Sequence, residues 1–209
     1  MSGQEHTECF FCLDTFVVNL LQSDNYMTDN SLTIRKAVGS DVDTLLALAE
    51  FSRQTMRANG NILQWPVGYP SRQDIETDMR RGDCHVLCGD GGCVVGSFVF
   101  RQGPDPTYRV IYDGAWTDNE RPYHVIHRVM SLPTVHGIFA AMMAYCFSHC
   151  GNIRIDTHRD NTIMRHLIVK YGFRYCGIIH TACAENNERL AFQWLGDGNG
   201  GAENKFKTE

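Results

Sequence analysis

Residues Leu32 to Ala37 alternate between apolar and polar, which is the period of a strand that buries one face. The pattern then changes to a helical period, and apolar residues between Val42 and Ala49 fall on one face, with Ser40-Asp41 placed to cap the helix start. A second helix is predicted to begin at Ser71 and to end near Arg81-Gly82.

Strand-like runs follow at about 84–89, 93–101 and 107–113, and Tyr123 to Met130 reads as a further strand. A long helix is then predicted from Gly137 to Cys150, because its apolar residues form a broad stripe at helical spacing. The chain as far as Cys150 therefore combines strands with helices of both amphipathic and apolar character.

The last third repeats this alternation of elements. Residues 152–158 alternate as a strand, and apolar residues between 163 and 171 recur at helical spacing. Asp160 or Asn161 can cap that helix, and Gly172 can end it, because glycine enters the left-handed conformation cheaply. The final strands are predicted at Cys176–Thr181 and Leu190–Leu195, so the fold class is α+β, with helices inserted into a mixed sheet.

The chain has 209 residues, a length that suits one domain with appended ends. We expect an N-terminal extension over residues 1–31, in which Met27 offers an alternative start, a domain over 32–195 and a flexible tail over 196–209. The formal net charge is -5, and Lys and Arg form no cluster. This distribution lacks the basic surface that a nucleic-acid-binding protein needs, so we expect no nucleic-acid partner.

Nine cysteines at irregular spacings, in a chain too large to need disulfides, indicate reduced thiols in a cytoplasmic protein. Cys9 and Cys12 with His6 could form half of a zinc site, but no second ligand pair has matching spacing, so we expect no metal. The apolar run from Cys9 to Leu21 is interrupted by polar residues and is too short to span a bilayer, so we expect no membrane partner.

The stretch from Asn152 to His158, followed by Asp160-Asn161 and by Lys170-Tyr171-Gly172-Phe173, resembles the acyl-CoA end of the GNAT N-acetyltransferases. The resemblance covers roughly Leu32 to Leu195 and implies the GNAT acyl-CoA N-acyltransferase fold. It also implies that the chain is an acyltransferase with acetyl-CoA as its co-substrate.

In GNAT proteins, backbone amides at a strand-to-helix junction bind the pyrophosphate of coenzyme A, because a helix N-terminus has free N–H groups and partial positive charge. The family pattern is Arg or Gln, two residues, Gly, one residue, then Gly or Ala. Gly137 matches this pattern, whereas Thr134 stands at the Arg/Gln position and Phe139 at the second small position. The resemblance assigns the cofactor to His136, Gly137, Ile138, Phe139 and Ala140; an ordinary strand-to-helix turn is the alternative.

The same resemblance places the pantetheine arm beside two further segments. Val129, Met130 and Ser131 lie on the strand that would pair its backbone with pantetheine and offer an amide to the thioester oxygen. Asn161 stands at the position of a pantetheine-contacting Asn, and it can serve as a helix cap at the same time.

An amine attacks a thioester only as the free base, so the site needs a proton acceptor. Tyr123 to Arg128 contains two imidazoles near the position where several GNAT relatives have a Glu. Strand alternation directs His124 and His127 to opposite faces, and we prefer His127 as the base because it lies beside the thioester end of the strand. A structural role is the alternative, and His158 and His180 are weaker candidates.

The departing thiolate benefits from a proton donor, which in this family is commonly a Tyr seven residues after the Asn. Here Ile168 occupies that position, and Tyr171 lies on roughly the same side of the helix. Tyr171 is therefore a candidate acid, with packing against Phe173 as the alternative and solvent or the amine as other proton sources.

Loops over the proposed thioester strand would bind the acceptor. Aromatic side chains could wall the site and one carboxylate could hold an ammonium; these candidates are Trp65, Tyr69, Tyr112, Asp113 and Trp116. An alternative is that Trp65 and Tyr69 anchor their loop to the core.

Together these features favour an enzyme that transfers acetyl from acetyl-CoA directly to a primary amine, because no Ser-His-Asp or Cys-His arrangement is evident. Acetylation of protein N-termini or lysines is one alternative, and a non-catalytic CoA-binding module is another. We expect a small-molecule or peptide amine as partner. The sequence is compatible with either a monomer or a homodimer.

Overall fold

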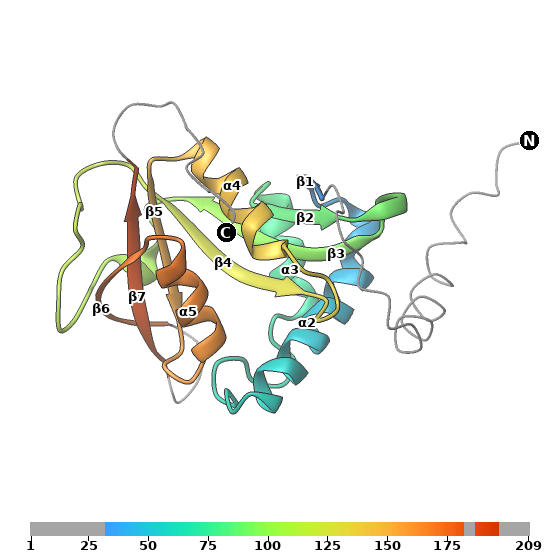
Figure 1. Cartoon of the computed structure of the whole chain (residues 1–209), viewed down its shortest axis with the longest axis horizontal. Coiled ribbons are helices and arrows are strands. Elements are labelled where there is room, and N and C mark those ends of the chain that lie inside the picture. Colours follow the sequence, from blue (N-terminus) through green and yellow to red (C-terminus); the bar gives the residue numbers. More distant parts are fainter. Residues whose placement is uncertain (1–31, 182–186, 197–209) are drawn as a thin grey trace, which may run out of the picture.

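The structure is a computed structural model that describes residues 32–181 and 187–196, and a mixed sheet lies at its centre (Figure 1). The predicted residues 1–31 and 197–209, with the Cys9–Cys12 pair, lie outside this description. The strands of the sheet are β1 Thr33–Lys36, β2 Cys84–Cys88, β3 Val94–Gln102, β4 His124–Ser131, β5 Asn152–Thr157, β6 Arg174–His180 and β7 Glu188–Leu195. The described α-helices are α2 Val42–Ala58, α3 Arg72–Arg80, α4 Ile138–His149 and α5 Thr162–Lys170.

The strand order is β1-β2-β3-β4-β5-β7-β6, and every neighbouring pair is antiparallel except β4 with β5. The parallel pair requires a crossover, which α4 supplies between the two strands. The α+β class with a mixed sheet is therefore confirmed.

Adjacent residues on β3 show how the helices cover the sheet. The ring of Phe100 lies 6.5 Å from that of Tyr145 on α4. The guanidinium of Arg101, which points to the other face, donates to Asp78 on α3 at 2.7 Å. On the first face, α5 joins α4 through an edge contact between Tyr171 and Phe139 at 5.2 Å. Thus α4 and α5 share one face, while α3 lies on the other.

The helix starts follow from local sequence. Ser71 caps α3 in a capping box, in which its Oγ accepts from the N–H of Asp74 and the Asp74 carboxylate accepts from the N–H of Ser71. Asp41 stands at the N-cap of α2, as predicted, but its carboxylate binds Arg35 and the N–H of Val38. The acid therefore ties the helix start to β1.

The predicted strand over residues 107–113 is wrong. A 3-10 turn spans Pro106–Tyr108, and Asp105 caps it by accepting from the N–H of Thr107 at 2.9 Å. Pro106 favours this turn because its ring fixes φ and removes a backbone donor. Further along, Tyr112 forms an isolated bridge to Ile178.

β4 and β5 are paired over only part of their length. His124–Ile126 of β4 pair with Ile153–Ile155 of β5, whereas β4 stays paired with β3 as far as Ser131. In the described part of the chain, the β5-facing edge of β4 therefore has no strand partner beyond Ile126. Figure 1 shows the two strands diverging at this end.

No helix that the structure describes is long and apolar enough to cross a membrane. Six cysteines lie within the described residues, and all six are free thiols. The cytoplasmic location stays a prediction.

Candidate active site

A cavity of about 540 Å³ opens where β4 and β5 diverge. Its walls come from β4, from the end of β5, from the starts of α4 and α5, and from the loop between α2 and α3. This volume lies within the range of pockets that bind small molecules. The cavity contains residues that were predicted for both the cofactor and the acceptor.

His127 lies in the cavity wall, and its Nε2 is 3.1 Å from Oδ2 of the buried Asp105. Burial alone would raise the pKa of Asp105, but the hydrogen bond and charge of His127, with the N–H of Thr107, outweigh burial and lower that pKa below its ordinary value. An ionised carboxylate only accepts, so Nε2 of His127 carries the proton. In the neutral ring, Nδ1 is then left as a proton acceptor.

Asp156 approaches the other nitrogen of the same imidazole. Its Oδ1 lies 3.9 Å from Nδ1 of His127, and the hydroxyl of Tyr108 donates to this oxygen. Burial, followed by the negative charge of Asp156, raises the pKa of Tyr108 well above its ordinary value, so its hydroxyl keeps the proton. Asp156 comes one residue after Ile155, the last residue of β5 that pairs with β4, and it lies in the cavity wall.

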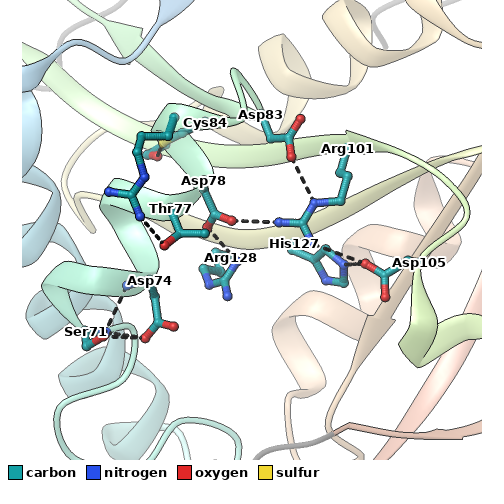
Figure 2. Close-up of polar contacts among 12 residues, drawn as sticks. Ser71, Asp74, Thr77, Asp78, Asp83, Cys84, Arg101, Asp105, His127 and Arg128 are labelled. Carbon is teal, nitrogen blue, oxygen red and sulfur yellow. Dashed lines mark hydrogen bonds and ion pairs between the residues drawn. The ribbon is translucent and has the colours of Figure 1, made fainter.

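Arg101 organises the carboxylates behind His127 (Figure 2). Its guanidinium contacts Asp78 at 2.7 Å, Asp83 at 2.9 Å and Asp105 at 3.5 Å. The side chains of Arg101 and Asp105 are only 20% and 4% exposed, which reduces solvent screening of these charges. Arg101 thus connects α3 and the end of β3 to the imidazole.

Arg128 also lines the cavity, although strand alternation would direct it to the face opposite His127. Its backbone φ is 49°, a left-handed value that is uncommon for a residue with a side chain. The turned backbone lets Nη1 bind Asp78 at 2.6 Å. Burial of Asp78 raises its pKa, although Arg128 and Arg101 act in the opposite direction.

His124 points away from this cluster. Its ring stacks on Phe100 at 4.6 Å, on the face covered by α4, and burial lowers its pKa. The prediction that His124 and His127 face opposite sides is therefore confirmed.

The comparisons with solved structures give the same overall arrangement. A GNAT-family acetyltransferase from Streptococcus agalactiae is 27% identical, with a TM-score of 0.71 over 83% of this chain and 99% of that one. One from Listeria monocytogenes is 18% identical, with a TM-score of 0.59 over 82% and 99%. The NatC complex bound to Gag peptide and CoA is 11% identical, with a TM-score of 0.50 over 78% and 98%. No protein-family model and no curated protein matches the sequence.

This chain belongs to the GNAT acetyltransferase family. The expected GNAT fold is confirmed, and the protein is an acyltransferase enzyme. The individual roles of the predicted site residues remain predictions.

The predicted cofactor residues divide between the cavity and its surroundings. Val129, Ser131, Ile138, Phe139 and Asn161 line the cavity. Met130 is buried in the hydrophobic core, 3% exposed, and the cavity lining does not include His136, Gly137 or Ala140.

Gly137 is the N-cap of α4 and has a φ of 82°. The helical hydrogen bonds begin with the N–H of Ala141 donating to the carbonyl of Gly137. The preceding amides therefore form the open end of the helix dipole, with no acidic residue in the first turn. An anion could bind at this end.

Asn161 caps α5, as predicted, by accepting from the N–H of Met164 at 3.1 Å. Its Nδ2 also donates to Oε1 of Gln64 at 2.9 Å, and Asn61 donates to the same oxygen at 2.8 Å. Gln64 therefore joins the loop between α2 and α3 to the start of α5. Gln64 was not predicted as a site residue, because nothing in the sequence around it indicates a partner as distant as Asn161.

Tyr171 lies outside the cavity lining and packs its ring edge against Phe139. Burial raises the pKa of Tyr171. Ile168, at the position of the usual family Tyr, is fully buried in the core. This arrangement favours packing over the role of acid for Tyr171, with Phe139 as its ring partner where Phe173 was expected.

Of the predicted acceptor residues, Trp65 and Tyr69 line the cavity, and their rings meet edge to face at 5.8 Å. Tyr112, Asp113 and Trp116 do not line it. Tyr112 stacks on His180, and Trp116 packs in a second core cluster, where its Nε1 donates to the carbonyl of Tyr108. Their segment forms no strand beside the cavity, which explains the difference.

Asp105 and Asp156 were not predicted as site residues. Asp105 has only the local signature of a turn before Pro106, and Asp156 reads as the polar half of an alternating strand. The sheet brings them together. Among the described residues, no group of three or more His, Cys, Asp or Glu could hold a metal ion.

Proposed function

We propose that this protein transfers acetyl from acetyl-CoA to a primary amine by direct attack of the amine on the thioester. The observation that carries the proposal is His127, hydrogen-bonded to an ionised Asp105, in the wall of the cavity where β4 leaves β5. An acyltransferase that uses an amine needs a base at this place, and a neutral imidazole with a free acceptor nitrogen suits that task.

Acetyl-CoA would bind along features that offer backbone donors. The β5-facing edge of Val129–Ser131 has no strand partner among the described residues, so it is available to the amides of pantetheine. The open end of α4 beyond Gly137 suits the pyrophosphate, and Asn161 stands beside the same cavity. The NatC structure, which contains CoA, supports the use of this fold for CoA binding.

The acceptor enters as an ammonium, and its cation is stabilised by the carboxylate of Asp156, while the rings of Trp65 and Tyr69 form an aromatic wall of the same cavity. Nδ1 of His127 takes one proton, which leaves a neutral amine. The imidazolium that forms lies between the carboxylates of Asp105 and Asp156.

The nitrogen lone pair then adds to the thioester carbonyl, and a backbone N–H of β4 among residues 129–131 stabilises the oxygen that gains negative charge. When the carbon–sulfur bond breaks, the new amide nitrogen loses its remaining extra proton to the thiolate or to solvent. His127 returns its proton to solvent, so the products are an N-acetyl amine, free CoA thiol and one proton.

A screen of small-molecule and peptide amines with acetyl-CoA tests this function. Thiol release that depends on the amine is the expected result, with a thermal shift on addition of acetyl-CoA alone. A thermal shift without thiol release for any amine would favour a CoA-binding module and contradict the proposal.

A further inference from the structure

We propose that the acceptor amine also carries a carboxylate or similar oxyanion, and that Arg128 binds it. This inference rests on the proposed amine acetylation and names the substrate class of the same site. The acceptor would thus be zwitterionic, like an amino acid, with its ammonium near Asp156 and its anion at Arg128.

The backbone supplies the first reason. A left-handed φ of 49° costs conformational energy for a residue with a side chain, and such strain concentrates at functional sites. The turn places Arg128 on the cavity side with His127, where a regular strand would have sent it to the other face. Arg128 lies at a β-bulge, where β4 has one more residue than β3 between the pairs Ser97–Met130 and Val99–His127, and bulges beside active sites redirect side chains in this way.

The balance of charges supplies the second reason. Arg101 contacts three carboxylates, those of Asp78, Asp83 and Asp105. Arg128 has a single ion pair among the described residues, with Asp78, and it shares that carboxylate with Arg101. The charge of Arg128 is therefore the less neutralised of the two, although its side chain is only 17% exposed.

The hydrogen bonds of the guanidinium supply the third reason. Nε of Arg128 is buried and has no hydrogen-bond partner among the described residues. A buried donor without a partner costs free energy, which an acceptor oxygen of a ligand would recover. The guanidinium also lies over the ring of Tyr69, 5.4 Å from its centre, which keeps it at the cavity wall.

The ammonium-binding and oxyanion-binding sides of the site thus lie at two consecutive residues of β4. His127 lies between the carboxylates that attract the ammonium, and Arg128 presents the guanidinium that attracts an oxyanion. An α-amino acid carries both groups within a few bonds of each other. A carboxamide of the same amino acid would retain the ammonium and lose the charge that Arg128 recognises.

The test compares α-amino acids, each with its own carboxamide, as acceptors for the wild-type enzyme and for Arg128→Gln. We expect the wild type to favour the amino acid in kcat/KM, and Arg128→Gln to reduce that preference by roughly 10- to 100-fold, the range of a charge-assisted hydrogen bond. Comparing preference ratios between the two enzymes cancels the different basicities of the amines. Arg80→Gln, on the exposed side of α3, should keep the wild-type ratio.

A wild-type enzyme that acetylates the carboxamides as well as or better than every amino acid would overturn the inference while leaving amine acetylation in place. If no amine is acetylated, the proposed function itself fails. If Arg128→Gln raises KM for acetyl-CoA and changes both acceptors equally, the oxyanion belongs to a phosphate of the co-substrate, and the inference is wrong. If the variant folds poorly, the wild-type comparison decides the matter once kcat/KM is calculated for the free-amine form of each acceptor.

Discussion

At the scale of single residues, the account depends on His127 as the base. His127→Gln should retain the fold and the affinity for acetyl-CoA but lower the acetylation rate by roughly 10²-fold or more. The loss should shrink at higher pH, because more of the amine is then already deprotonated. Rates measured across pH for the wild type and the variant check this.

His124→Gln is the matched control, because its ring stacks on Phe100 on the opposite face of β4. It should affect the rate much less. A near-normal rate and an unchanged pH profile in His127→Gln would assign the proton to water or to another residue.

Asp105 gives a prediction about pH and stability. Its pKa in the folded protein lies below the ordinary value of about 3.9, so its ionised form stabilises the fold fully above that value. This contribution is lost as pH falls from about 4 towards the folded pKa. Asp105→Asn lacks it, so the difference in Tm between wild type and variant should shrink between about pH 5 and pH 3. A difference that stays constant over that range would show that Asp105 is not tied to His127.

Some of the residues at the site could be predicted from the sequence, and others could not. His127 could be selected, because an imidazole on an alternating strand has a chemical role and a definite face. Asp105 and Asp156 could not, because only the strand order brings them to the same ring. Arg128 would have been assigned to the wrong face, because its left-handed backbone reverses the alternation.

At the scale of elements, the start of α4 should determine cofactor binding. Gly137→Glu should abolish the thermal shift that acetyl-CoA causes, because it adds negative charge where we propose that the pyrophosphate binds backbone amides. Gly137→Ala is the control: it meets the same unfavourable φ of 82°, and its Cβ would have no neighbour within 4 Å. We expect Gly137→Ala to be less stable than wild type yet to keep the ligand shift. If acetyl-CoA raises the Tm of both variants equally, the pyrophosphate binds elsewhere.

The hydrogen bonds of Gln64 should stabilise the loop between α2 and α3. Gln64→Leu removes the acceptor for the amides of Asn61 and Asn161, and we expect it to lower the free energy of unfolding by roughly 1–3 kcal/mol. Gln64→Glu keeps an acceptor oxygen and should lose less. Chemical denaturation of both variants checks the order, and an equal loss would show that the hydrogen bonds contribute little.

Elements were the most predictable level of the structure. The helical period and the Asn161 cap identify α5, and the Ser71 capping box identifies α3, because these signals are local. The predicted strand over 107–113 was wrong because a local pattern does not show which distant residues a segment packs against. Its apolar residues instead form a capped turn and a loop, in which Tyr108 stacks on Trp116 and Tyr112 bridges to Ile178 of β6, far away in sequence.

At the scale of the whole molecule, acetyl-CoA should stabilise the folded state. A ligand at 100 times its Kd adds about 2.7 kcal/mol, which for a protein of this size corresponds to a rise in Tm of roughly 5–10 °C. Differential scanning fluorimetry with increasing acetyl-CoA measures this. No shift at millimolar acetyl-CoA would contradict the cofactor assignment.

The most direct test of amine acetylation follows both products in one reaction. Purified wild-type protein is incubated with acetyl-CoA and an amine panel, while free thiol is measured in solution and N-acetyl amine by mass spectrometry. We predict one molecule of N-acetyl amine for each thiol released, with both signals strongly reduced in His127→Gln. Thiol release without formation of an acetylated amine would contradict amine acetylation. Equal yields of N-acetyl amine from the wild type and from His127→Gln would contradict catalysis at this site.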